Sequence, residues 1–430
     1  MGVHGASHTF MSRGGPAARG AIGISLATAA GQAIFLLISP VLTRMYSPDA
    51  FGLFTVLTAV IAVLAVVSTL RLELAVPLAP SNREARRVVV AGVSAAFLIC
   101  LVAGGIVSLN TGAIAGAFAG IDAAGWLWVV PVSAFLFGSY EIVSQYAVRH
   151  KRYSLLGKRS FVHGAGMSAA QLGFGFFSVR GGLLLGQMVG KAAAIAFMLP
   201  GLRLVSGIAV RDMSLRTWKR SVRANWRFPL FLMPSAFLNT LGTQIPFVLI
   251  GLLYGAPIVG LLGLTQRVLA APASLIGQAV SNVYMGESAK THRTATGSNY
   301  RFFMKTSTIL AIVGVPFFGV VFLVAPSVFE LVFGQEWQEA GYYAQAMSLS
   351  FLLQFVVGPV SQTLIINNAQ LTQLTWDSGR LAVVAGAIVA ASAFGADALS
   401  AVWIYSASSA IAYVILWLLC LGKARSRVGA

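Results

Sequence analysis

Long apolar stretches alternate with short loops along this chain, and its basic residues gather in every second loop. A hydrocarbon layer about 30 Å thick requires about 20 consecutive, mostly apolar residues in a helix that crosses it. By this measure the sequence predicts an all-α integral membrane protein with about twelve transmembrane helices. The predicted spans are 21–43, 51–70, 88–108, 125–147, 160–179, 182–202, 228–252, 256–286, 303–333, 340–366, 381–396 and 398–421, with a turn at Gly395, Ala396 and Asp397 between the last two.

The loops on one side of the predicted spans carry nearly all of the positive charge. Of the 30 Lys and Arg residues, 26 flank the spans on that side, Arg159 and Arg380 among them, and only Arg44 and Arg180 flank them on the other. Loops rich in Lys and Arg stay in the cytoplasm, so both termini are predicted to be cytoplasmic. A miscounted span would exchange the sides downstream of it, and no exchange occurs. The sorting therefore supports an even number of spans independently of hydropathy.

The composition also argues against a soluble protein. The chain is 57% hydrophobic and 10% charged, whereas soluble domains carry about 25% charged residues. A net charge of +18 is compatible with a nucleic-acid partner, but the sorting explains it as topology and as contact with anionic lipid headgroups. We therefore expect membrane lipids, and no nucleic acid, among the partners.

The spans fall into two halves of six, separated by a basic segment. We expect a disordered cytoplasmic tail over 1–20, an N-terminal six-helix lobe over 21–203, a basic cytoplasmic linker over 204–227, a C-terminal six-helix lobe over 228–421 and a cytoplasmic tail over 422–430. The linker is predicted to lie amphipathically on the inner leaflet.

A weak internal repeat relates these halves. Across the turn between its first two spans, each half carries a Pro, a Tyr and a Gly-Leu pair, namely Pro40, Tyr46, Gly52 and Leu53, then Pro246, Tyr254, Gly260 and Leu261. An offset of six spans preserves orientation, which predicts a parallel repeat with its axis along the membrane normal. Two such halves would enclose a central cleft and rock against each other to alternate access.

Motifs for catalysis and cofactor binding are missing. The sequence has no phosphate-binding Gly-rich loop followed by Lys and Ser or Thr, so we expect no ATP hydrolysis. The five His residues have no metal-ligand spacing, and there is no Cys-x-x-Cys pair or nucleophile elbow. Without paired carboxylates at membrane depth, glycosyl transfer is disfavoured. We therefore predict no cofactor, no metal and no enzymatic activity.

A few charges fall at membrane depth, where they cost roughly 2.5–3.5 kcal/mol each and mark candidate functional groups. Arg267 and Lys191 lie near mid-depth, and Glu141 is the only carboxylate that we place well inside a span. Lys191 either faces a watery cleft or pairs with Glu141 as a structural ion pair. Arg44 and Arg71 close the first and second spans, where they either contact cargo or simply extend to the interface.

A band of polar residues lies in the seventh predicted span, with Asn239, Thr243 and Gln244 as cavity candidates. Thr240, Thr243 and Gln244 share one helix face, and hydrogen bonds between helices are the alternative role for all of them. A cleft with two deep cations and one carboxylate suits an anionic cargo, because Arg and Lys bind phosphate groups strongly in a low dielectric. A long lipid tail on such a cargo could remain in the bilayer.

Three segments resemble a known family: TRMYSPDAFGL at 43–53, RLELAV at 71–76 and QRVLAAPASLIG at 266–277. They are similar to the polysaccharide (O-antigen type) flippases of the MOP superfamily. The resemblance implies two six-helix lobes, a cation-lined cavity and ATP-independent flipping of undecaprenyl-diphosphate-linked oligosaccharide to the outer leaflet. It also implies a bacterial inner membrane location and cargo contacts at Arg44, Arg71 and Arg267, whereas Lys191 matches no family motif.

Two other classes remain as alternatives. An ion-coupled exporter of small molecules, similar to the MATE drug exporters, would carry deep carboxylates for cationic drugs, and here Glu141 stands alone. A membrane enzyme of polysaccharide assembly, such as a polymerase or ligase, would carry a long polar outer loop. Polymerases and glycosyltransferases of a lipopolysaccharide or exopolysaccharide pathway are possible partners of a flippase, and Glu141 is its candidate for binding a coupling ion.

Overall fold

The computed structural model describes residues 31, 33–34, 36–118, 121, 123–202, 204, 214–294, 300–367 and 369–425. Ten helices among them are long and apolar enough to cross a membrane. A shorter apolar helix, Leu36–Met45, matches the end of the first predicted span, whose beginning lies outside the described residues. The major helices are α2 (Pro48–Ser68), α3 (Asn82–Leu109), α5 (Val129–Arg149), α6 (Tyr153–Phe176), α7 (Gly182–Leu202), α9 (Met233–Tyr254), α10 (Ala256–Thr294), α11 (Tyr300–Phe333), α12 (Gln338–Val360), α14 (Gln370–Ala393) and α15 (Ala398–Arg425).

The all-α membrane architecture predicted from the sequence is confirmed, and the twelve predicted spans each overlap a helix. The predicted turn between the last two spans is also present, with Gly395 in the left-handed region at φ +75°. Several boundaries differ by six or more residues, and two of them bear on the site. Helix α6 begins at Tyr153 instead of 160, and α14 begins at Gln370 instead of 381. Arg159 and Arg380 therefore lie inside helices and not in flanking loops.

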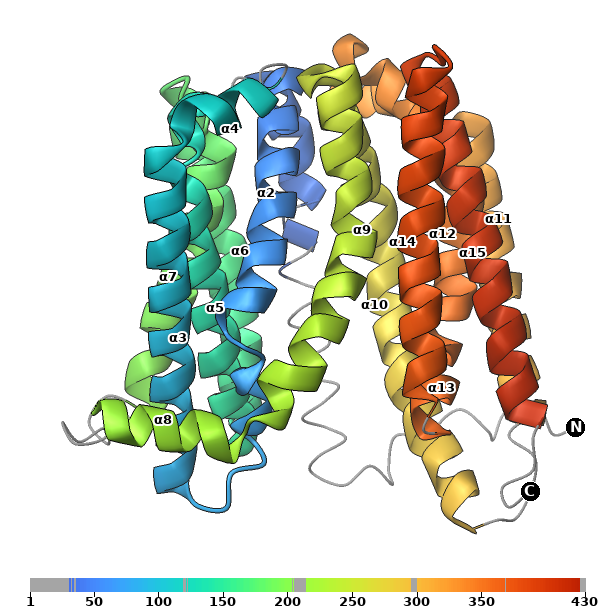
Figure 1. Ribbon diagram of the computed structural model, residues 1–430. Coiled ribbons are helices and arrows are strands. Elements are labelled where there is room, and N and C mark those ends of the chain that lie inside the picture. Colours follow the sequence, from blue (N-terminus) through green and yellow to red (C-terminus); the bar gives the residue numbers. More distant parts are fainter. Residues whose placement is uncertain are drawn as a thin grey trace, which may run out of the picture.

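The helices form two groups that meet along α2, α9 and α10 (Figure 1). On one side α3 packs on α5 and α6 packs on α7, and on the other α11 and α15 pack on α12. Helix α2 contacts both α9 and α10, and α9 also packs on α14. The junction between the two groups is therefore made by the second span of the first half, α2, and the first two spans of the second half, α9 and α10.

Two glycines bring α2 and α10 into direct backbone contact. A Cβ added to Gly52 would lie 2.0 Å from the carbonyl oxygen of Ala256, and one added to Gly260 would lie 1.9 Å from that of Pro48. Gly260 follows Gly52 by the same interval that separates Ala256 from Pro48. In the repeat, Gly52 corresponds to Gly260 and Pro48 corresponds to Ala256. Each glycine therefore contacts the residue that is equivalent to the contact of the other glycine. This reciprocal contact is the pattern that a local two-fold axis produces, and it supports the internal repeat.

The end of the bundle at which α2 and α10 begin, called the closed end below, is sealed by aromatic packing. Trp337, in the short helix η7 (Gln335–Trp337), is 1% exposed. Its indole Nε1 donates a 3.1 Å hydrogen bond to the carbonyl of Thr43, and its ring meets Phe51 edge-on at 4.8 Å between centroids. These contacts tie the loop before α12 to the start of α2, so the two halves are joined here.

The other end, called the basic end below, carries the short helix α8 (Leu215–Ala224), which lies across the bundle (Figure 1). Ser214 caps it by accepting a hydrogen bond from the backbone N–H of Thr217. Its Trp218 donates a 3.1 Å hydrogen bond to the carbonyl of Ala91 and anchors it on α3, while Lys219 and Arg220 are exposed. An apolar face on protein with a basic face outward is typical of an interfacial helix.

Candidate functional site

A cavity of about 550 Å³ lies where α5, α6 and α7 face α10. Lys191, Arg267 and Glu141, which the sequence analysis singled out, all line it, so the fold brings together charges from three separate helices. We call it the cationic cavity. Its described lining is Gly31, Tyr140, Glu141, Arg159, Ser160, His163, Gly164, Met167, Lys191, Arg267, Ala270, Ala271 and Ser274.

Lys191 is held by aromatic rings. Its Nζ lies 3.8 Å from the ring centroid of Tyr140 and 4.5 Å from that of Phe137, both on α5. The electron-rich face of a ring attracts a cation and compensates part of its lost hydration. No ion pair within 4.0 Å joins Lys191 to Glu141 in the described part of the chain, so the structural pair considered above is not formed. Glu141 is exposed at the cavity.

Arg159 is a cavity residue that sequence reasoning missed. Its guanidinium carbon lies 4.3 Å from the centroid of the same Tyr140 ring, and it donates a hydrogen bond to the hydroxyl of Ser144. His163, one helical turn further along α6, also packs against Tyr140, at 5.6 Å between ring centroids. The spacing of four between Arg159 and His163 puts both on one helix face. That spacing was the available signal, but the predicted span began one residue after Arg159.

Arg267 enters the cavity from α10 and joins the two halves. Its guanidinium carbon lies 4.1 Å from the ring centroid of Phe54 and 5.6 Å from that of Phe51, both on α2. With Arg159 and Lys191 on one side and Arg267 on the other, the described lining of the cavity holds three cations and one carboxylate, Glu141. Such a site has a positive potential, and it favours an anionic ligand whose charges are spread over several oxygens.

Arg44 and Arg71 lie away from this cavity. Arg44 is exposed near the closed end, and its Nη1 donates to the carbonyl of Pro40 at 3.4 Å. Arg71 follows α2 with a left-handed backbone, φ 57°, and pairs with Glu73 at 3.1 Å. Neither lines the cationic cavity, so their role as cargo contacts stays a prediction.

The polar candidates of α9 serve other contacts. Asn239 donates a 3.2 Å hydrogen bond to Asp377 of α14, which is the interhelical alternative. Thr243 donates to the backbone carbonyl of Thr240 at 2.9 Å, and Gln244 lies 3.5 Å from the Thr243 hydroxyl. None of these side chains lines the cationic cavity.

Asp377 corrects the expectation that Glu141 is the only carboxylate inside a span. Its side chain is 2% exposed, and it accepts hydrogen bonds from Asn239 and Gln373. Arg380 lies 3.8 Å from it, stacks on Trp376 at 4.7 Å and is 8% exposed. The pair was missed because the span was predicted to begin at 381. Polar side chains inside a membrane helix lower its hydropathy even where neighbouring helices provide their hydrogen-bond partners and counter-ions.

Removing one member of this pair should be strongly destabilising. Asp377→Leu would leave the Arg380 guanidinium buried without its counter-ion, and we expect a loss of about 3–5 kcal/mol in the free energy of unfolding. The double variant Asp377→Leu/Arg380→Leu should recover most of that loss. Denaturant unfolding in lipid bicelles measures both, with the exposed Glu336→Leu as the matched control. A single variant as stable as the native protein would contradict this role.

The fold is shared with transporters of the MOP superfamily. An inward-facing multidrug resistance MATE family transporter of that superfamily superposes with a TM-score of 0.71 at 14% identity, covering 93% of this chain and 97% of its own. The lipid II flippase MurJ, in an inward closed conformation, gives a TM-score of 0.73 at 12% identity, covering 93% of this chain and 87% of its own. These likenesses define the fold.

The family follows from the sequence. The model of the polysaccharide biosynthesis protein family matches residues 41–342, and this chain belongs to that family. The teichuronic acid biosynthesis protein TuaB of Bacillus subtilis (strain 168) is 25% identical over 201 residues, which are 46% of this chain and 41% of TuaB. The match thus spans less than half of TuaB. The family match confirms the predicted resemblance to a polysaccharide biosynthesis family, and the fold is the one found in transporters of the MOP superfamily. The apolar helices make the protein a multi-pass membrane protein.

Proposed function

We propose that this protein flips undecaprenyl-diphosphate-linked oligosaccharide from the cytoplasmic to the outer leaflet of the bacterial inner membrane. The observation that carries the proposal is the cationic cavity, in which Arg267 from one half faces Arg159 and Lys191 from the other. Arginine binds phosphate through two parallel N–H donors, and lysine adds a point charge. A diphosphate is a chemically matched ligand for such a cluster. Membership of a polysaccharide biosynthesis family supports an oligosaccharide as the rest of the cargo.

Orientation follows from the charge sorting. The positive-inside rule places the basic end, with α8 and the end of α15, in the cytoplasm and the closed end outside. Residues 21–203 and 228–421 would then form two lobes joined by the basic segment 204–227, with tails 1–20 and 422–430 on the cytoplasmic side. In this orientation the structure represents a state sealed toward the outside, ready to take cargo from the cytoplasmic leaflet.

Cargo binding would draw the two lobes together. In the empty state, Arg267 of one lobe and Arg159 with Lys191 of the other repel each other, because like charges in a poorly hydrated cavity interact strongly. A diphosphate between them replaces repulsion with attraction from both sides. A ligand shifts a conformational equilibrium only through its differential affinity for the two states. The change from repulsion to attraction between the lobes provides this differential affinity. Closure toward the cytoplasm would then open the opposite end.

Glu141 remains our proposal for a coupling site. It is an acid exposed to the cavity, whereas the buried Asp377 already has Arg380 as its counter-ion. The membrane potential offers about 2.3 kcal/mol per charge per 100 mV.

The alternative function, a MATE-like export of small molecules, is favoured by the shared fold. Cationic cargo is disfavoured, because the described lining of the cavity has three cations and one carboxylate. Polymerases and glycosyltransferases stay proposed partners.

Thiol labelling tests both the orientation and the site. In a background with Cys100 and Cys420 replaced, Glu339→Cys at the closed end should react with an impermeant reagent from outside. Arg220→Cys on α8 and Ala271→Cys in the cavity should react only from the cytoplasmic side. Added undecaprenyl diphosphate should protect Ala271→Cys but not Arg220→Cys. Labelling of Glu339→Cys from the cytoplasm would overturn the orientation, and a lack of protection would count against the site.

A further inference from the structure

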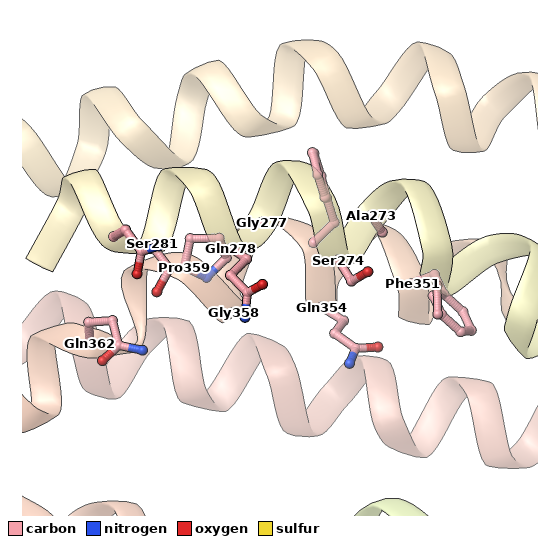
Figure 2. Close-up of a pocket in the computed structure, with 13 residues that line it drawn as sticks. Ala273, Ser274, Gly277, Gln278, Ser281, Phe351, Gln354, Gly358, Pro359 and Gln362 are labelled. Atoms are coloured by element: carbon pink, nitrogen blue, oxygen red, sulfur yellow. The ribbon is translucent and has the colours of Figure 1, made fainter. Parts of the chain in front are cut away.

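A second cavity, of about 450 Å³, follows α10 beyond Arg267, between α10, α12 and the short helix α13 (Gln362–Ile366). Its described lining has no charged side chain, in contrast to that of the cationic cavity. We call it the amide cavity (Figure 2). Its lining is Ala270, Ala273, Ser274, Gly277, Gln278, Ser281, Asn282, Phe351, Gln354, Phe355, Gly358, Pro359 and Gln362.

One side of the amide cavity is a polar stripe on α10. Ser274, Gln278 and Asn282 recur every four residues and therefore share one helix face, and all three are exposed. Figure 2 shows Ser274 and Gln278 beside Gln354 of α12 and Gln362 of α13. Four side-chain amides thus converge from three helices on one space.

These amides are free to bind a ligand. Within the described residues, the side-chain amides of Gln278, Asn282, Gln354 and Gln362 make no hydrogen bond to the protein, and the Oε1 atom of Gln362 is buried without a partner. Each amide has two N–H donors and a carbonyl acceptor. Such a set matches a ligand rich in hydroxyl and acetamido groups, which are also both donors and acceptors. Because these amides carry no net charge, they give the cavity no preference for an ionic ligand.

The remaining surface suits flat apolar faces. Phe351 and Phe355 contribute aromatic rings, and Cβ atoms added at Gly277 and Gly358 would meet no atom closer than 3.8 Å. The glycines therefore leave room beside the rings. A pyranose ring has the corresponding chemistry, because its axial C–H groups form apolar patches and its hydroxyl groups project from the edge. Pockets that combine apolar walls with a few convergent polar groups are typical ligand sites.

The two cavities adjoin along α10. Ala270 and Ser274 line both of them, and the 15 residues from Arg267 to Asn282 rise about 22 Å along a helix. We infer that the amide cavity is a glycan subsite, which holds neutral sugar units of the cargo while the cationic cavity holds the diphosphate. The inference rests on the proposed function, and it assigns head and glycan to separate sets of residues.

Binding of two probes to the full-length protein in lipid nanodiscs separates these sets. The first probe is undecaprenyl diphosphate, and the second is undecaprenyl diphosphate bearing a neutral trisaccharide, presented as a panel of hexose and N-acetylhexosamine compositions. The variant is Gln278→Ala/Gln354→Ala/Gln362→Ala. Gln370→Ala, an exposed glutamine of α14 that lies outside the cavity, is the matched control. Thermal unfolding of each variant verifies that it is folded.

We expect the native protein and the Gln370→Ala control to bind at least one trisaccharide probe about tenfold more tightly than the bare lipid, since each amide hydrogen bond adds a modest net gain. The triple variant should lose this ratio and keep its affinity for the bare lipid. A native ratio near one across the panel, or a ratio that survives in the triple variant, would overturn the glycan subsite. Failure of the native protein to bind bare undecaprenyl diphosphate would instead contradict the proposed function.

Discussion

Replacing Arg267 with alanine is expected to reduce transfer of lipid-linked oligosaccharide at least about a hundredfold, because a paired Arg–phosphate contact contributes several kcal/mol. The side chain lies in the cationic cavity over Phe54 and Phe51 of α2. Loss of its charge removes the only cation that the C-terminal half contributes to the described lining of that cavity. Cargo could then no longer attract both halves at once.

The measurement is surface polysaccharide in a strain that depends on this protein, normalised to the amount of protein in the membrane. Arg267→Lys should retain part of the activity, since a point charge replaces a planar, bidentate donor. Arg180→Ala, which removes an exposed cation outside the cavity, is the control and should behave as native. Full activity of Arg267→Ala at normal expression would exclude a role for this residue in cargo binding.

A side chain at Gly260 is expected to abolish transport by a different route. A Cβ there would lie 1.9 Å from the carbonyl oxygen of Pro48, and both residues lie in helices whose backbones cannot move independently of the bundle. Gly260→Val should therefore separate α2 from α10 and prevent the closed end from sealing. Activity should fall as far as in Arg267→Ala, although the residue touches no cargo. Gly386→Val, at a glycine with open space around it, is the control.

Spin labels at Phe177 and Gln335 measure the separation directly. Both residues are exposed, and they lie in different halves at the closed end. In the native protein and in Gly386→Val we expect a short distance distribution from this pair. In Gly260→Val the distribution should move to longer distances. An unchanged distribution together with normal transport would show that the close glycine contact is not required to seal this end.

Much of this fold could be predicted from the sequence because a bilayer leaves few options. Backbone polar groups in hydrocarbon must be satisfied within the segment, so a long apolar stretch is a helix. Charge sorting then indicated an even number of spans, and the internal repeat indicated two halves in the same orientation. The deep charges Lys191, Arg267 and Glu141 were found by their depth, and Arg267 also by the family resemblance; the structure brings all three to one cavity.

The missed residues have a common physical cause. Arg159, Asp377 and Arg380 lie inside helices whose ends were predicted from hydropathy. Polar side chains near a helix end lower the local hydropathy as much as a loop does, so the predicted spans began after these residues. Whether such a residue faces a ring, a counter-ion or water depends on neighbouring helices, which periodicity within one helix does not specify. The aromatic contacts of Lys191 with Tyr140 and Phe137 belong to the same class.

The most direct test is leaflet transfer in proteoliposomes that contain only this protein. Undecaprenyl diphosphate bearing a fluorescent oligosaccharide is placed in one leaflet, and its arrival in the other is followed with an impermeant quencher, with Arg267→Ala vesicles in parallel. We expect the native protein, given an ion gradient, to transfer the probe far faster than protein-free vesicles, and the Arg267→Ala protein to transfer it at the protein-free rate. Native protein that transfers no faster than empty vesicles under any imposed gradient would contradict a flippase.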